Sequence, residues 1–157
     1  MFYKIKDKYC SIKNGISNII RWFPIIWEIR DWDAEYLYVL IYKHLSHVED
    51  YLRYSGHRVN SIKNADRIKI AKNLAKRLYE HDYTSNALIP VEEKYGELKI
   101  RIEKDDMLPM CNKVIFDESS EERKARSKAY EHAEYMEKQD RKMLFVMLDK
   151  YMDKWWD

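Results

Sequence analysis

The stretch Asp33–Tyr54, which reads DAEYLYVLIYKHLSHVEDYLRY, decides the fold. Its apolar residues recur at spacings of three and four, which places them on one face of a helix. They are Leu37, Ile41, Leu45, Val48 and Leu52. Asp31 or Asp33 can accept backbone N–H bonds in the first turn, and Gly56 follows the last turn as a stop. The spacing predicts a helix over residues 33–54.

Helical patterns continue on both sides of this stretch. Residues 11–22 place isoleucines on one face, and Pro24 is expected to end that helix because the residue before a proline disfavours the helical conformation. Two further helices are predicted, over residues 61–83 and 120–156. The apolar positions are Ile12, Ile16, Ile19 and Ile20 in the first helix, Ala65, Ile68, Ala71, Ala75 and Leu78 in the third, and Ala129, Ala133, Met136, Leu144, Met147, Leu148, Tyr151 and Trp155 in the last.

Glycine and proline are scarce in this chain of 157 residues, with three of each against roughly nineteen in total expected from average usage. Few breakers favour long helices over a sandwich or a barrel. Residues 84–117 are the exception, because Pro90, Gly96 and Pro109 lie there and Glu97–Glu103 alternates with a period of two, as a strand does. A pairing partner for that strand is available in residues 113–116.

We therefore expect a mainly α fold, organised as one helical domain over residues 1–157. It would be a small bundle of about four helices. Residues 84–117 would form an irregular or β insertion, with a short β-hairpin or extended excursion near residues 95–117.

Several classes of protein are disfavoured by the sequence. Cys10 and Cys111 form no metal or redox motif, and two reduced thiols are expected. No apolar run approaches the roughly 18 residues that a membrane span requires, and the charged N-terminus is followed by no signal-like apolar run. The chain also contains no phosphate-cradling glycine loop, nucleophile elbow or zinc spacing, so we expect no cofactor and no catalytic residue.

Three of the five tryptophans fall within residues 22–32, a segment that leads into Arg30-Asp31-Trp32-Asp33. We interpret this segment as a structural clasp. Trp27 and Trp32 would anchor it in the core, and Asp31 and Asp33 would cap the next helix.

Asp140 is the distant member of this predicted clasp, because it lies beside the apolar stripe of the last helix. A carboxylate buried there needs a partner, since an unpaired buried charge costs several kcal/mol. The candidate partners are Arg30, Arg67 and Arg77. The alternatives are a solvated position at the edge of the stripe, or a local pair with Lys138 or Arg141.

These landmarks carry a resemblance to a known group of proteins. The Trp22-Phe23-Pro24 and Ile26-Trp27 pieces, the Arg30–Asp33 turn, the Gly56-His57 break and the terminal Trp155-Trp156-Asp157 resemble those of small uncharacterised proteins of tailed bacteriophages. Arg77-Leu78, Asp82-Tyr83 and Gln139-Asp140 add to it, and residues 84–117 are least alike. The resemblance implies a phage origin and the host cytoplasm as the setting, and it implies no activity.

A basic segment suggests an anion-binding function. Residues 58–77 carry seven Lys or Arg against one acid, and Lys69, Lys72 and Lys76 form a stripe on one helix face. With Arg30, Trp32 and Arg67 they make the predicted ligand-binding set, in which cations hold phosphates and aromatic rings stack on bases. The alternative interpretation is an ordinary solvated helix face.

A metal-dependent hydrolase is a further alternative. His44 and His47 lie one turn apart, and His81-Asp82 with Asp140 completes an order of residues typical of HD-type phosphohydrolases. The competing explanation is that His44 is a packing histidine and that the His-Asp dipeptide arises by chance.

Three functions follow as hypotheses. The first is a non-enzymatic phage accessory protein that sequesters a host-derived nucleotide immune signal, in a pocket that could form between subunits of a homo-oligomer. The second is a protein–protein interaction module, either an inhibitor of a host defence protein or a minor virion component. It is motivated by the long amphipathic last helix and by the tryptophans at its end, which are expected to be exposed. The third is the metal-dependent hydrolase.

Overall fold

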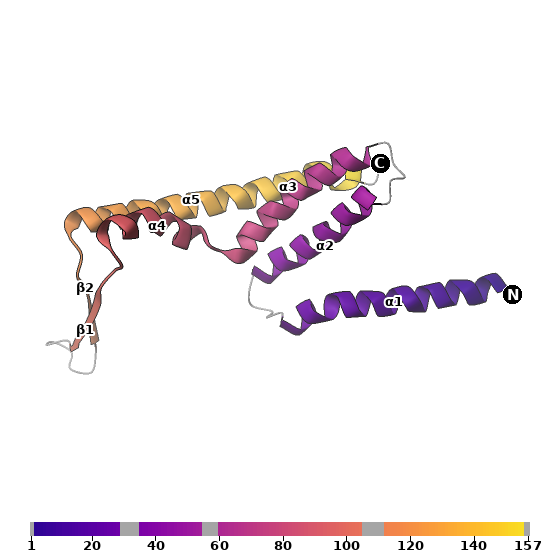
Figure 1. The fold of residues 1–157 in the computed structure, drawn as a ribbon, viewed down its shortest axis with the longest axis horizontal. Coiled ribbons are helices and arrows are strands. Elements are labelled where there is room, and N and C mark those ends of the chain that lie inside the picture. Colours follow the sequence, from indigo (N-terminus) through magenta and orange to yellow (C-terminus); the bar gives the residue numbers. More distant parts are fainter. Residues whose placement is uncertain (1, 29–34, 55–59, 105–111, 156–157) are drawn as a thin grey trace. The chain divides into compact units, whose positions relative to one another are not determined.

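The computed structural model describes residues 2–28, 35–54, 60–104 and 112–155, with the backbone alone for residues 2–6 and 104 (Figure 1). The described part is mainly helical, as predicted. It contains five α-helices, which are α1 (Phe2–Glu28), α2 (Glu35–Tyr54), α3 (Ser61–Glu80), α4 (Tyr83–Tyr95) and α5 (Ser120–Tyr151). A two-stranded hairpin and a short 3-10 helix, η1 (Met152–Trp155), complete it. None of the described helices is long and apolar enough to span a lipid bilayer.

Helix α1 is much longer than the predicted 11–22 segment. It runs through Pro24, which was expected to end it. A proline inside a helix removes one backbone hydrogen bond and crowds the preceding turn, but it does not forbid continuation. The isoleucines that were predicted to share one helix face, Ile12, Ile16, Ile19 and Ile20, are exposed.

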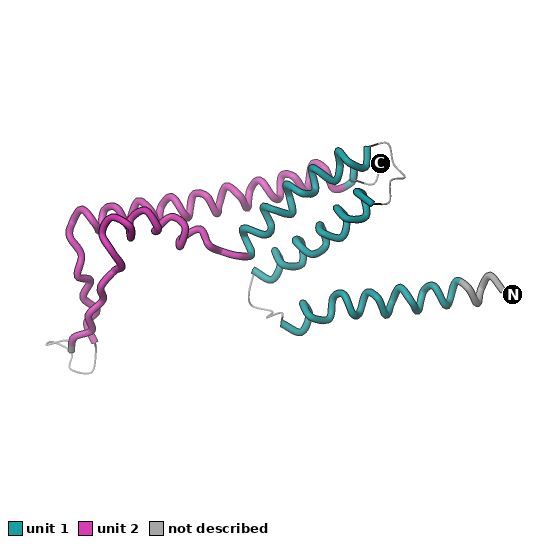
Figure 2. Tube along the Cα trace, viewed as in Figure 1, with its two compact units in different colours: residues 1–79, 153–157 teal, residues 80–152 magenta. Residues whose placement is uncertain are grey.

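The chain divides into two compact units, residues 1–79 with 153–157, and residues 80–152 (Figure 2). In the first unit, α2 and α3 run antiparallel, because Glu49 of α2 pairs with Lys72 of α3 while the later Arg53 pairs with the earlier Asp66. The core of this unit includes Leu45, Val48 and Leu52 of α2, as predicted, and Ala65, Ile68, Ala71, Ala75 and Leu78 of α3. Leu37 lies on the predicted helix, but half of its surface is exposed.

The end of the described chain returns to this first unit. The Asn64 side-chain amide on α3 donates a hydrogen bond of 3.0 Å to the Lys154 carbonyl in η1. Trp155, the next residue, is buried with 3% of its surface exposed. Trp155 is thus buried like other members of the predicted apolar stripe, although α5 itself stops at Tyr151. The expectation of exposed tryptophans at the end of the last helix was wrong for Trp155.

In the second unit, α4 packs against α5 (Figure 1). Residues 84–117 are less irregular than predicted. Pro90 lies inside α4, and Gly96 is the C-cap of that helix. Strands β1 (Ile100–Lys104) and β2 (Asn112–Phe116) then form an antiparallel hairpin, in which Ile100 pairs with Phe116 and Ile102 with Val114. The predicted hairpin near residues 95–117 is confirmed.

Candidate functional site

One face of α1 presents large apolar side chains to solvent. Between residues 9 and 27, eight of them are each at least 54% exposed, and Trp27 reaches 74%. A half-exposed side chain of this size has on the order of 100 Å² of solvent-accessible surface, so the eight together expose about 800 Å². An apolar patch on a monomer usually covers only a few hundred Å². We call this set the α1 face; its members are Tyr9, Ile12, Ile16, Ile19, Ile20, Phe23, Ile26 and Trp27.

The spacing of the α1 face is regular. From Tyr9 to Ile26 the steps alternate between three and four residues, which is the seven-residue repeat of a helix that pairs with another helix. Ile20 and Trp27 lie one turn after Ile16 and Phe23 and widen the stripe on one side. The Phe23 and Trp27 rings are in contact, with centroids 5.5 Å apart.

A different side of α1 contacts α2. Ile25 is buried, and the Trp22 indole meets the His47 imidazole edge-on with the ring centroids 6.1 Å apart. Burial, followed by the nearby Arg21 charge, lowers the pKa of His47 below its usual value. Trp22 lies roughly a third of a turn around the helix from the centre of the α1 face, and Ile25 lies on nearly the opposite side. Contact with α2 therefore leaves that face uncovered.

A cavity of about 320 Å³ lies beside this contact, within the first unit. Both charged and apolar side chains line this cavity, so its lining does not indicate one class of ligand. The lining residues are Pro24, Ile25, Glu28, Glu35, Tyr36, Val39, Lys43 and Tyr79.

The predicted basic stripe on α3 is in part already neutralised. The Lys72 ammonium lies 2.5 Å from the buried Glu49 carboxylate, which also accepts a hydrogen bond of 2.8 Å from Arg53. Burial alone would raise the pKa of Glu49, but the hydrogen bonds from Lys72 and Arg53 outweigh it and lower the pKa. Lys72 is thus part of the α2–α3 contact, and its charge is not available in full to a ligand.

The other members of the predicted ligand-binding set have separate surroundings. Lys69 and Lys76 are exposed, and the Arg67 guanidinium donates to the Asn64 side-chain oxygen at 3.3 Å. Arg30 and Trp32 lie outside the described residues, as do Asp31 and Asp33 of the predicted clasp. Nucleotide binding stays a prediction.

The clasp prediction was wrong for Trp27, which is exposed and not a core anchor. For Asp140, the solvated alternative was also wrong, since this carboxylate is buried. The Tyr83 hydroxyl donates a hydrogen bond of 2.7 Å to Asp140 Oδ2, a partner that the sequence reasoning did not consider. Lys138 and Arg141 each pair with a glutamate one turn earlier, Glu134 and Glu137. The Arg–Asp140 pair stays a prediction.

The proposed metal ligands are dispersed over several elements. His44 and His47 lie on α2, Asp82 is exposed just before α4, and Asp140 lies on α5. His81 has a positive φ of 52°, a left-handed conformation that suits the turn between α3 and α4. Within the part of the chain that the structure describes, no three His, Cys, Asp or Glu side chains are grouped so as to hold a metal ion.

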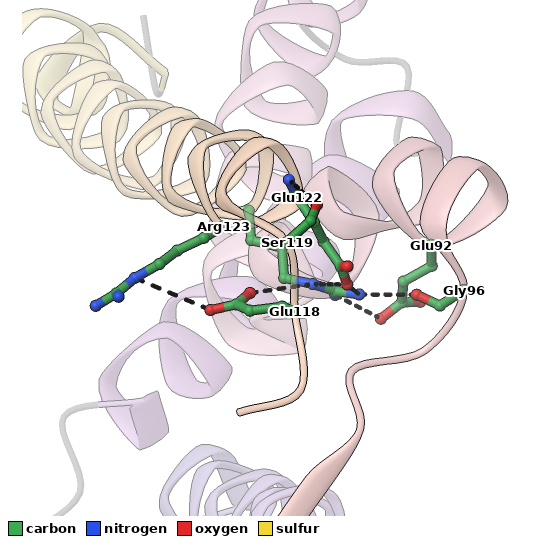
Figure 3. Close-up of polar contacts among 7 residues, drawn as sticks. Glu92, Gly96, Glu118, Ser119, Glu122 and Arg123 are labelled. Atoms are coloured by element: carbon green, nitrogen blue, oxygen red, sulfur yellow. Dashed lines mark hydrogen bonds and ion pairs between the residues drawn. The ribbon is translucent and has the colours of Figure 1, made fainter. Parts of the chain in front are cut away.

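An ion cluster around the buried Arg126 in the second unit was not predicted from the sequence (Figure 3). The Arg126 guanidinium donates to the Gly96 carbonyl at 2.7 Å and to Glu122 at 2.9 Å, and Glu118 and Glu92 each approach it to 4.0 Å. Ser119 caps α5 by accepting from the Glu122 backbone N–H. The cluster joins the end of α4 to the start of α5. The sequence pattern that could have indicated part of this cluster is the Ser119-x-x-Glu122 capping box at the start of α5.

The hairpin carries a second uncovered apolar face. Ile100 and Phe116 are cross-strand partners, as are Ile102 and Val114, and all four are at least half exposed. They share one face because alternate residues of a strand point the same way. A two-stranded hairpin with an uncovered apolar face is marginal in water by itself.

Comparison with known protein-family models, curated proteins and solved structures finds no match to this chain.

Proposed function

We propose that the protein is a protein–protein interaction module whose binding surface is the α1 face. The observation that carries the proposal is the row of eight large side chains from Tyr9 to Trp27, which remain exposed while the neighbouring Ile25 is buried. Exposed patches of this extent are typical of interaction sites.

The energetics support a macromolecular partner. At about 25 cal/mol per Å², covering half of the roughly 800 Å² would contribute on the order of 10 kcal/mol before the costs of association. The surface is a long convex stripe on one helix, whereas sites for small molecules are concave. A helix that lays its own apolar stripe along α1 fits this shape.

The resemblance to phage proteins suggests the biological setting of the module. We place it in the host cytoplasm as an accessory protein, where its partner would be a host defence protein or a virion component.

Site-specific photo-crosslinking in cells tests the proposal. A photoreactive amino acid at Ile16, in the middle of the α1 face, should give crosslinks to polypeptide, whereas the same group at Asn14, which is exposed on the opposite side of the helix, should give few. Equal yields at Ile16 and Asn14, or no polypeptide adduct at Ile16, would contradict the proposal.

A further inference from the structure

We infer that the α1 face binds the α1 face of a second copy of this chain, in an antiparallel two-helix coiled coil. The inference rests on the proposed function and narrows it, because the occupant of the α1 face is then a second copy of the chain and not a host or virion protein; it also gives the direction of pairing.

The order of side chains favours antiparallel pairing. One seam position of the repeat holds Tyr9, Ile16 and Phe23, and the other holds Ile12, Ile19 and Ile26. In an antiparallel pair each seam position faces the other kind, so Tyr9 meets Ile26, Ile16 meets Ile19, and Phe23 meets Ile12 of the second copy. Both aromatic rings of the seam, Tyr9 and Phe23, are then placed against an isoleucine. Parallel pairing would oppose Tyr9 to Tyr9 and Phe23 to Phe23.

The flanking charges agree with this direction. Lys8 and Lys13 flank the seam on its two sides, and both are exposed. In a parallel dimer, a residue that flanks the seam on one helix lies next to the flanking residue five positions later on the other helix. Lys8 would then lie next to Lys13 of the second copy, and the two positive charges would repel each other. In the antiparallel dimer Lys13 lies beside Ile20 of the second copy, where its alkyl chain can cover apolar surface while its ammonium stays in water.

The position of the α2 contact is compatible as well. Trp22 and Ile25, where α1 contacts α2, lie near the carboxyl end of α1. Antiparallel pairing places these contacts at opposite ends of the coiled coil, so that the two folded bodies do not compete for one location. Parallel pairing would place both at the same end.

The available area is sufficient. Each partner in a standard stable interface buries about 800 Å², which the α1 face reaches if a second copy covers it in full. The two α1 faces together would thus form an interface of ordinary size without help from the hairpin.

Disulfide trapping on the full chain tests the direction of pairing. With Cys10→Ser and Cys111→Ser as background, Ile12→Cys and Phe23→Cys are each oxidised alone and then as a mixture. Antiparallel pairing sets Ile12 opposite Phe23, and two Ile12 positions lie about 16 Å apart along the axis. A covalent dimer should therefore form only in the mixture. A covalent dimer from each variant alone would show parallel pairing and overturn the inference.

Light scattering tests the second copy itself. The expected mass is twice the chain mass of 19.3 kDa. Ile16→Asp with Ile19→Asp should return it to the monomer value, whereas the matched pair Asn14→Asp with Asn18→Asp on the opposite side should leave the dimer intact. Circular dichroism checks that both variants retain their helical content.

The two proposals fail separately. A wild-type chain that stays monomeric at all concentrations overturns the inference of a second copy. If Ile16 nevertheless crosslinks to a different polypeptide, the proposed function stands with another partner. If Ile16 gives no polypeptide crosslink either, both proposals are wrong.

Discussion

Arg126 shows how much a single residue contributes to the second unit. Its side chain is 4% exposed, and the Glu118 and Glu122 carboxylates beside it are 13% and 12% exposed. Removing the guanidinium would leave these acids partly buried without their cation, and the loss of one member of a buried ionic cluster is more costly than the loss of a surface pair.

Arg126→Ala is expected to lower the free energy of unfolding by about 3 kcal/mol, measured by urea denaturation. Arg123→Ala provides the matched control, because this arginine is 82% exposed and lies 3.9 Å from Glu118. The control should change the free energy by less than about 0.5 kcal/mol. Similar losses in both variants would mean that the cluster does not stabilise the fold.

His47 predicts a pH dependence. Its folded-state pKa is lowered by burial, so the unfolded chain binds the proton more readily and stability must rise with pH. Stability is therefore lost as the pH falls through the ordinary histidine value of 6.5. Glu49 has a lowered pKa too, but its contribution is lost only below its ordinary value of 4.5.

Urea midpoints compared at pH 7.5 and pH 5.5 check this effect. The His47→Gln variant should lose less stability between the two pH values than the wild type. His132→Gln, at an exposed position of α5, serves as the control. The assignment is wrong if the wild type and His47→Gln show the same pH slope.

At the scale of elements, substitution of glycine by alanine is expected to have opposite effects on stability at Gly15 and at Gly96. Gly15 lies inside α1 and Gly96 has a φ of +82°, while an added Cβ would meet no atom within 4 Å at either site. Gly15→Ala should stabilise its helix by about 0.5–1 kcal/mol, and Gly96→Ala should destabilise by about 1 kcal/mol or more. Thermal melts followed by circular dichroism measure both. Changes of the same sign would contradict the assigned backbone conformations.

The elements also show what sequence patterns can predict. Helices α2, α3 and α5 were predicted to within a few residues, apart from the last turn, because their apolar positions are buried at helical spacing. Helix α4 and the extent of α1 were missed, because Pro90 and Pro24 were interpreted as breaks. A proline inside a helix costs free energy but does not prevent the helix from continuing. A local sequence pattern does not show whether tertiary packing offsets that cost.

Prediction of the site was limited for a related reason. The spacing from Tyr9 to Ile26 is visible in the sequence, but nothing in it shows that this face is exposed while Ile25 is buried. The Arg126 cluster depends on Gly96 and Glu92, which approach α5 only because α4 packs against it.

At the scale of the whole molecule, the contact of η1 with α3 ties the end of the described chain to its first unit. Trp155→Ala should lower the free energy of unfolding by about 3 kcal/mol or more, because Trp155 is almost fully buried. Met152→Ala, three residues earlier and 54% exposed, should cost less than about 1 kcal/mol. Chemical denaturation compares them. Equal costs would mean that the Trp155 contact contributes little.

The same contact has a consequence for synthesis. Residues 80–152 form one continuous segment of the chain, so the second unit is synthesised without interruption. The first unit also includes residues 153–155, because the Asn64 side chain on α3 donates a hydrogen bond to the Lys154 carbonyl. At about 5–20 residues per second, the first unit waits several seconds after α3 has been translated. During that interval the first unit lacks the buried Trp155 and the hydrogen bond from Asn64 to Lys154, so a nascent chain arrested before Asp153 should bind chaperones more readily than the completed chain.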